Sequence, residues 1–181
     1  MANADIARGF TPVNALGANY CGSVNKYFIP AGNSTAMAVG DLVKFAGSAD
    51  ADGVATIDRA AATDPVLGAI VGFVADKDYD SQTHRTASTA RYALVADDPS
   101  QMFVAQQSGT ITAADLGLNA DILATAVNTT IGLSNMEIDT SSKATTATLQ
   151  VKIVGVDLRP DNEIGANTDC IVKINNHQYG S

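Results

Sequence analysis

The sequence predicts a mainly β protein: an antiparallel β-sandwich or barrel with one short helical insert and an extended N-terminal arm. Two observations support this. Eight short runs rich in Val, Ile, Thr or aromatic residues alternate with turn signals along the chain. The crossover helices that a parallel sheet needs are missing from the pattern. With 181 residues, the chain has the length of one domain, or of one domain with an arm.

Each predicted strand is a short apolar run bounded by polar or turn-forming residues. The predicted strands cover residues 24–29, 37–45, 54–59, 66–74, 90–96, 101–106, 147–155 and 170–175. In the last of them Cys170, Val172 and Ile174 alternate with polar residues. This period of two is typical of a strand with one face buried and one face in water.

Turn and helix signals divide the runs. Asp52 and Gly53 form a hairpin signal between two of the predicted strands. Thr112 and Asp115 have the spacing of a capping box, so they predict the start of a short helix, and residues 121–126 could add a second helical turn. The polar segments 76–89 and 128–146 are predicted to be long loops, where contact functions are often found.

The first 23 residues are predicted to form an extended arm, separate from a β-rich domain of residues 24–181. Three glycines discourage regular structure there, and apolar residues are sparse. The candidate anchors of this arm are Ile6, Phe10, Val13 and Leu16. Their spacing is too open for a core strand, so we expect them to bind pockets on another chain. A free arm of this kind is expected to become ordered only in the assembly.

The charge distribution argues against binding to nucleic acid or to an acidic membrane surface. The formal net charge is −8, and no Lys or Arg occurs between Arg91 and Lys143. Phosphate recognition requires clustered cations, which this sequence lacks. The start of the chain has no apolar signal segment, and no apolar run is long enough to span a membrane. We therefore expect folding in a cytoplasm and no membrane or nucleic-acid partner.

Residues for catalysis are scarce, so no enzyme activity and no cofactor are expected. The only histidines are His84 and His177, and no nucleophile motif accompanies them. Paired acids at Asp97 and Asp98 leave a hydrolase as a minor alternative. Cys21 is interpreted, like Cys170, as a reduced thiol packed as a small apolar group, with a disulfide as the second interpretation.

One acidic segment raises the question of a bound cation. Asp50, Asp52 and Asp58 offer oxygen ligands close to Gly53. The spacing differs from an EF-hand, because the glycine comes too early and the terminal Glu is absent. A hairpin turn is the favoured interpretation, and a bound cation is the alternative.

Five stretches resemble, in order, the head decoration (cement) proteins of tailed double-stranded DNA bacteriophages. These stretches are PVLGAIVGF at 65–73, STARYALVADDP at 88–99, ITAADLGLN at 111–119, GVDLRPDNEIGAN at 155–167 and VKINNHQ at 172–178. The similarity extends over most of residues 28–179. It implies a β-rich domain on the outer surface of an icosahedral capsid, with the major capsid protein as partner and no catalytic residues.

This resemblance leads to the expected role, which is to join neighbouring capsomers and stabilise the head of the virion. We also expect the protein to contact copies of itself as a dimer or trimer, because closed symmetric assembly is the usual way to cover a weakly charged surface. The alternative is a tail-associated or fibre module that binds host glycan. The absence of Trp and the presence of only five Tyr argue against a stacking platform for sugars.

Overall fold

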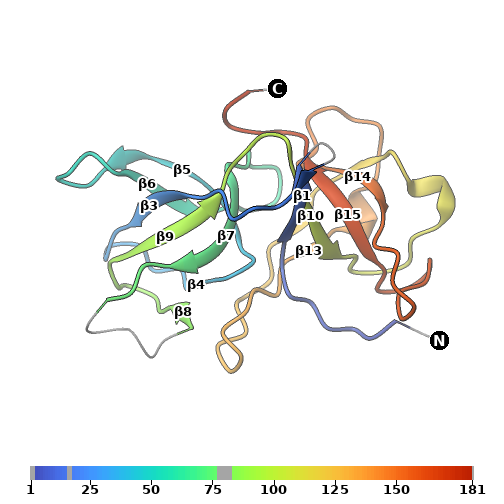
Figure 1. The fold of residues 1–181 in the computed structure, drawn as a ribbon, viewed down its shortest axis with the longest axis horizontal. Coiled ribbons are helices and arrows are strands. Elements are labelled where there is room, and N and C mark those ends of the chain that lie inside the picture. The colour runs from blue at the N-terminus through green and yellow to red at the C-terminus, as the bar shows by residue number, and fades with distance from the viewer. Residues whose placement is uncertain (1–2, 16–17, 77–82, 181) are drawn as a thin grey trace.

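The computed structural model describes residues 3–15, 18–76 and 83–180. These residues form two β-rich lobes that lie side by side (Figure 1). A small closed barrel forms one lobe, and a six-stranded antiparallel sheet forms the other. The prediction of a mainly β fold is confirmed. One short helical insert was predicted, and the described residues contain two single 3-10 turns.

The barrel lobe has five strands in the closed order β3-β6-β5-β7-β9. They are β3 (Asn25–Ile29), β5 (Leu42–Ala49), β6 (Ala55–Arg59), β7 (Gly68–Phe73) and β9 (Arg91–Ala96). The pairs are antiparallel except for β3 with β6, which meet in parallel at Phe28 and Thr56 and so close the barrel. A two-stranded ladder of β4 (Met37–Ala38) and β8 (His84–Arg85) accompanies it.

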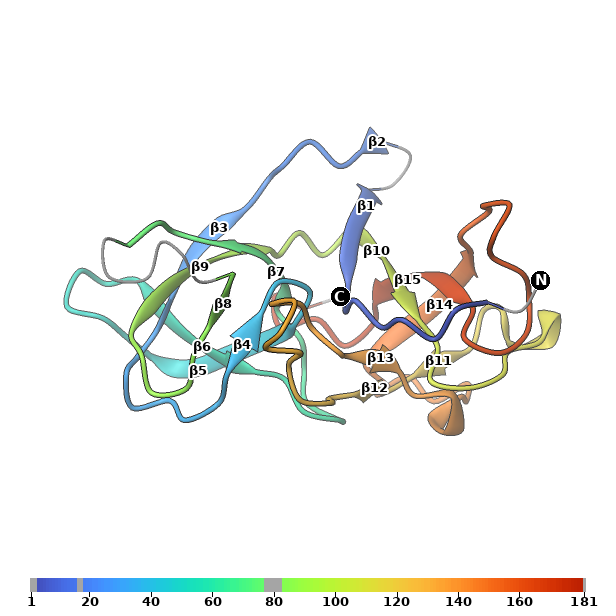
Figure 2. The ribbon, with the colours of Figure 1, turned by 90° about the horizontal axis from the view of Figure 1, so that it is seen from below.

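The sheet lobe has the strand order β11-β14-β15-β10-β1-β2, with every pair antiparallel. Its strands are β1 (Thr11–Ala15), β2 (Ala18–Asn19), β10 (Gln101–Gln106), β11 (Asn119–Ala120), β14 (Val151–Val156) and β15 (Asp169–Ile174). Strands β12 (Ile122–Leu123) and β13 (Glu137–Ile138) pair beside it (Figure 2). The helices are single 3-10 turns, η1 (Ala113–Asp115) and η2 (Thr140–Ser142). No helix in the described part of the chain could cross a membrane.

The alternation predicted for the last strand is present in the structure. In β15 the side chains of Cys170, Val172 and Ile174 are buried, whereas Ile171 and Lys173 between them are partly exposed. The buried set faces the core of the sheet lobe. The sheet therefore has an inner face in the core and an outer face that remains accessible.

The two lobes share one hydrophobic cluster. Leu42, Ala69 and Ala96 come from barrel strands, yet they pack in the same cluster as Phe103 and Val172 of the sheet. A second cluster fills the barrel itself; it consists of Tyr27, Ile29, Met37, Val43, Ile57, Leu67, Ile70, Ala93 and Val95. Because the first cluster spans both lobes, we expect them to fold together.

Each of the eight predicted strand regions contains a strand, but the structure differs from the prediction in one strand region and in one predicted helical turn. Region 37–45 divides into β4 and β5, because the chain turns at Gly40, which has a φ of +94°. The second helical turn predicted at 121–126 is wrong: residues 122–123 form β12, which pairs with β13. The capping box is present, since the Asp115 carboxylate accepts the N–H of Thr112 at 2.8 Å.

The expectation that the first 23 residues stay outside the core is wrong for Phe10 and for β1. Phe10 is only 1% exposed and belongs to the cluster that spans both lobes. Strand β1 follows it and pairs with β10 from Thr11 to Ala15. The sparse apolar residues of this segment did not indicate a strand. Backbone pairing with β10 holds β1 in the sheet, and burial of the single aromatic side chain of Phe10 attaches the segment to the core.

Candidate functional site

A hairpin of residues 126–135 projects from the molecule between the two lobes (Figure 1). Ile131 lies at its tip and is 50% exposed. The N–H of Asn128 donates to the carbonyl of Leu133 at 3.0 Å, and the N–H of Gly132 donates to the carbonyl of Asn128 at 2.8 Å. These bonds fix the turn, so the hairpin presents one large apolar side chain to solvent on a defined backbone.

The base of the hairpin is held by a buried ion pair. The Asp41 carboxylate is fully buried and accepts hydrogen bonds from the Ser134 hydroxyl at 2.6 Å and from the Arg59 guanidinium at 3.0 Å. The same guanidinium donates to the carbonyls of Ala124 and Thr125. Charge-assisted bonds are stronger than neutral ones. Asp41, just before β5, and Arg59, at the end of β6, therefore hold the chain on both sides of the hairpin, at residues 124–125 and at Ser134.

The hairpin also lies against the segment before β8. Gly132 has a φ of +70°, and the side chain of Thr83 occupies the space where a Cβ at this position would be. The amide of Asn135 donates to the carbonyl of Ala126 at 3.0 Å and closes the lower part of the hairpin. The tip is thus mounted on a base with several independent contacts.

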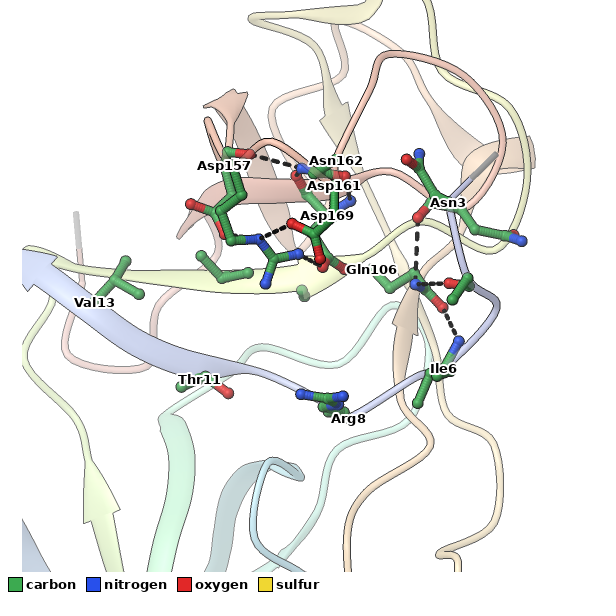
Figure 3. A pocket seen from close by; sticks show the side chains of 16 residues that line it. Asn3, Ile6, Arg8, Thr11, Val13, Gln106, Asp157, Asp161, Asn162 and Asp169 are labelled. Atoms are coloured by element: carbon green, nitrogen blue, oxygen red, sulfur yellow. Dashed lines mark hydrogen bonds and ion pairs between the residues drawn. The ribbon is translucent and has the colours of Figure 1, made fainter. Parts of the chain in front are cut away.

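A groove of about 460 Å³ crosses the sheet lobe (Figure 3). Thr11, Val13 and Val104 lie in it, between residues 3–8 and the loop that joins β14 to β15. The N-terminal wall is held in place by side-chain bonds. Gln106 accepts the N–H of Ile6 at 3.0 Å and donates to the carbonyl of Ala4 at 2.9 Å. Asn3 donates to two carbonyls of the facing loop, those of Glu163 and Ala166, both at 2.8 Å.

The opposite wall of the groove carries a charge cluster. Arg159 lies 3.1 Å from the carboxylate of Asp157 and 3.7 Å from that of Asp161, and it donates to Asp169. One guanidinium thus faces three carboxylates, which leaves this wall acidic. Asp161 is the most exposed of the three, with 80% of its side chain in solvent.

The four arm residues predicted as contacts have different positions. Ile6 is 51% exposed at the groove, and Val13 is partly exposed inside it. Phe10 is buried in the core of its own chain, so in this structure it is not available to a partner. Leu16 lies outside the described residues. The structure brings Ile6 and Val13 to one groove and separates Phe10 from them.

The acidic segment considered for a cation forms a hairpin turn. The carboxylate of Asp50 accepts the N–H groups of Asp52 at 2.9 Å and Val54 at 2.8 Å, together with the hydroxyl of Tyr92 at 2.6 Å. The carboxylate of Asp58 accepts the amide of Asn33 at 2.8 Å. Within the described residues, no group of three or more His, Cys, Asp or Glu side chains has a geometry that could hold a metal ion.

Asp97 is part of a hydrogen-bonded cluster at one end of the barrel. Its carboxylate accepts the amide of Asn25 at 3.0 Å, the hydroxyl of Tyr27 at 2.5 Å and the hydroxyl of Tyr179 at 3.1 Å. The two hydroxyl oxygens are 2.6 Å apart. Burial, aided by the bond to Asp97, raises the pKa of Tyr27. These contacts give both carboxylate oxygens a hydrogen-bond partner. The cluster therefore has a structural role: it connects β3 to the C-terminal segment.

His177 lies beside the Asp97 cluster, and nothing in the sequence pattern indicated that the two residues are neighbours. It is 7% exposed, and its Nδ1 accepts the N–H of Tyr179 at 3.1 Å. Burial lowers the pKa of His177, and the nearby Asp97 carboxylate opposes the shift. The two residues are far apart in the sequence, so no local spacing could have indicated that they are neighbours.

The two cysteines are free thiols, Cys21 exposed and Cys170 buried. The interpretation as a packed apolar group is therefore confirmed for Cys170 and wrong for Cys21. Burial raises the pKa of the Cys170 thiol to about 11, so it packs as a neutral side chain at ordinary pH. A scan against protein-family models, a search of curated proteins and a search of solved structures each found no match for this chain.

Proposed function

We propose that this protein is a structural virion protein that binds the outer surface of an icosahedral phage capsid and joins neighbouring capsomers. The observation that carries the proposal is the projecting hairpin with Ile131 at its tip. An apolar side chain on a fixed, protruding turn suits a pocket on a partner protein. The resemblance of five stretches to phage head decoration proteins supplies the class of partner, the major capsid protein.

The fixed base of the hairpin supports a role under load. A protein that joins capsomers must resist the outward pressure of packaged DNA without deforming. Asp41 and Arg59 hold the base through a buried ion pair, and Ser134 connects the hairpin to it. Through these contacts, a force on the hairpin tip would pass to the barrel strands, and the turn would not move independently of them.

The proposed contact is mainly apolar and depends weakly on salt. The exposed side chain at the tip is Ile131, and the sequence has no Lys or Arg between Arg91 and Lys143 to form salt bridges from this region. Screening by salt of about 0.5 M shortens the Debye length to a few ångströms, which weakens exposed ion pairs and leaves apolar burial intact. Capsid-bound protein should therefore remain bound in such salt.

The test is binding of purified protein to capsids that lack it, measured as bound copies per capsid after sedimentation. Ile131→Asp should reduce occupancy at least tenfold, because a buried charge replaces an apolar contact. Ile164→Asp is the matched control, since Ile164 has nearly the same exposure, 51%, but lies in the loop between β14 and β15. It should bind like the parent protein.

Ile6→Asp, in the same assay, tests the remaining arm contact. Ile6 is the predicted anchor that the structure leaves half exposed. A loss of occupancy in Ile6→Asp alone would move the capsid contact from the hairpin to the groove. Full occupancy in both Ile131→Asp and Ile6→Asp would contradict the proposed mode of binding.

A further inference from the structure

The outer face of the sheet lobe has an apolar centre. Cross-strand pairing places Val104 of β10 opposite both Thr11 of β1 and Ile171 of β15, and directly opposed residues point to the same side of a sheet. Val154 of β14 is 48% exposed, and Val13 is partly exposed in the groove. These side chains form an apolar strip, part of which lies in the groove between residues 3–8 and the loop that joins β14 to β15.

One end of this face is basic. Lys173 of β15 lies directly opposite Lys152 of β14, and Met102 of β10 is the partner of Lys173 on its other side. Like charges directly opposite each other destabilise a sheet. Lys152 donates to the carbonyl of Gly117 at 3.1 Å, but within the described residues neither lysine forms a salt bridge. An approaching carboxylate would relieve the repulsion.

The other end of the same face is acidic. Asp169 begins β15, four residues before Lys173, which corresponds to about 13 Å along a strand. Beside it lie Asp157 and Asp161, with Arg159 among the three carboxylates. Arg8 lines the groove as well, so three carboxylates against two guanidinium groups leave one net negative charge in the groove.

We propose that this outer face binds the outer face of a second copy of the chain about a two-fold axis. The axis lies in the plane of the interface, perpendicular to the strands. A half-turn about it brings the two faces together with their ends exchanged. The basic end of each copy then meets the acidic end of the other, and the two apolar strips around Ile171 meet in the middle. This is the pattern of an isologous interface, in which one patch is complementary to itself.

The dimer deepens the proposed function, because it specifies which surface joins two copies of a capsid-binding protein. Its test nevertheless uses isolated protein, so the two proposals can fail separately. The hairpin with Ile131 lies outside the outer face and stays free in the dimer. Capsid binding without dimerisation, or dimerisation without capsid binding, would each identify which proposal is wrong.

The test is sedimentation equilibrium of the full chain at low salt, with charge reversals at the two ends. Lys173→Glu places a carboxylate opposite the partner's Asp161, and Asp161→Lys places an ammonium group opposite the partner's Lys173. Each single variant should weaken dimerisation about tenfold or more, since like charges then meet across the interface. The double variant Lys173→Glu/Asp161→Lys restores opposite charges at both contacts and should dimerise like the parent.

A mixture of the two single variants provides an independent outcome. In the mixed dimer, the introduced glutamate of one copy meets the introduced lysine of the other, and the original Lys173 and Asp161 meet at the second contact. The mixture should therefore dimerise more tightly than either variant alone. Asp52→Lys is the charge-matched control for Asp161→Lys, because Asp52 is exposed in the turn between β5 and β6, in the barrel lobe (Figure 1). A monomeric parent protein, or a double variant no better than the singles, would overturn the proposal.

Discussion

Arg59 donates a hydrogen bond across 3.0 Å to Asp41, and both side chains are largely removed from solvent, at 9% and 0% exposure. Arg59 ends β6, and Asp41 directly precedes β5, so the pair fastens two neighbouring strands of the barrel. Through Ser134 it also fastens the projecting hairpin. The stability of the barrel and the position of the hairpin therefore depend on the same buried charge pair.

Arg59→Met should lower the free energy of unfolding by about 3–5 kcal/mol, because it leaves the Asp41 carboxylate buried without its counter-charge. Lys44→Met is the matched control. Lys44 pairs with Asp64 at 2.7 Å, but both side chains of that pair are partly exposed, at 30% and 25%. Its removal should cost less than about 1 kcal/mol. Urea denaturation monitored by circular dichroism gives both values, and equal costs would contradict the role given to Arg59.

Gly9→Ala should destabilise the protein more than Gly47→Ala. Both glycines have a positive φ, +71° and +77°, where an L-residue costs roughly 1–2 kcal/mol. A Cβ at Gly47 meets nothing within 4 Å, whereas one at Gly9 would collide with the carbonyl of Gly40 and lie 2.6 Å from the Cβ of Ser134. Overpacking adds about 1–3 kcal/mol at Gly9. Gly9→Ala should therefore melt at a lower temperature than Gly47→Ala. Identical melting temperatures would mean that Gly9 does not pack against Gly40 and Ser134.

Phe10→Ala should cost about 3–5 kcal/mol of unfolding free energy, as for other buried aromatic residues. Ile6→Ala in the same segment should change it by no more than about 0.5 kcal/mol, because Ile6 is half exposed. A sharp difference between the two separates a docked segment from a free arm. If Phe10→Ala were as stable as the parent, the first residues would behave as the disordered arm that the sequence suggests.

His177 should make the protein less stable as pH falls below about 6.5, the ordinary histidine pKa. Burial holds the pKa of His177 below that value in the folded state, so the unfolded chain binds the proton more readily. The stabilising contribution is complete above the unfolded pKa and is lost as pH falls towards the folded one. In denaturation curves between about pH 5 and pH 7, His177→Gln should flatten this dependence, whereas His84→Gln should retain it.

The strands of this fold could be predicted because their signals are local. Alternation in β15 and the turn at Asp52 and Gly53 both depend on residues close together in the sequence, and the structure retains both. The capping box at Thr112 is a signal of the same kind. Such features need no knowledge of the tertiary fold.

The parts that could not be predicted depend on distant partners. Strand β1 forms because β10 offers it an edge, and Phe10 is buried because strands of both lobes surround it. The ion pair of Asp41 and Arg59 and the neighbours of His177 are set by the tertiary fold in the same way. Most of the projecting hairpin, from residue 128 on, falls in the predicted loop 128–146, but no pattern in that loop indicated that Ile131 would be its exposed tip.

A reconstruction of the virion tests the central claim most directly, because it shows both where the protein lies and how many copies are present. We predict density for the two-lobed domain on the outer capsid surface, in hundreds of copies, with the 126–135 hairpin directed at the shell. Density confined to the tail or a fibre, in a few copies or tens of copies, would support the glycan-binding alternative. That result, or the absence of the domain from the capsid surface, would contradict the account.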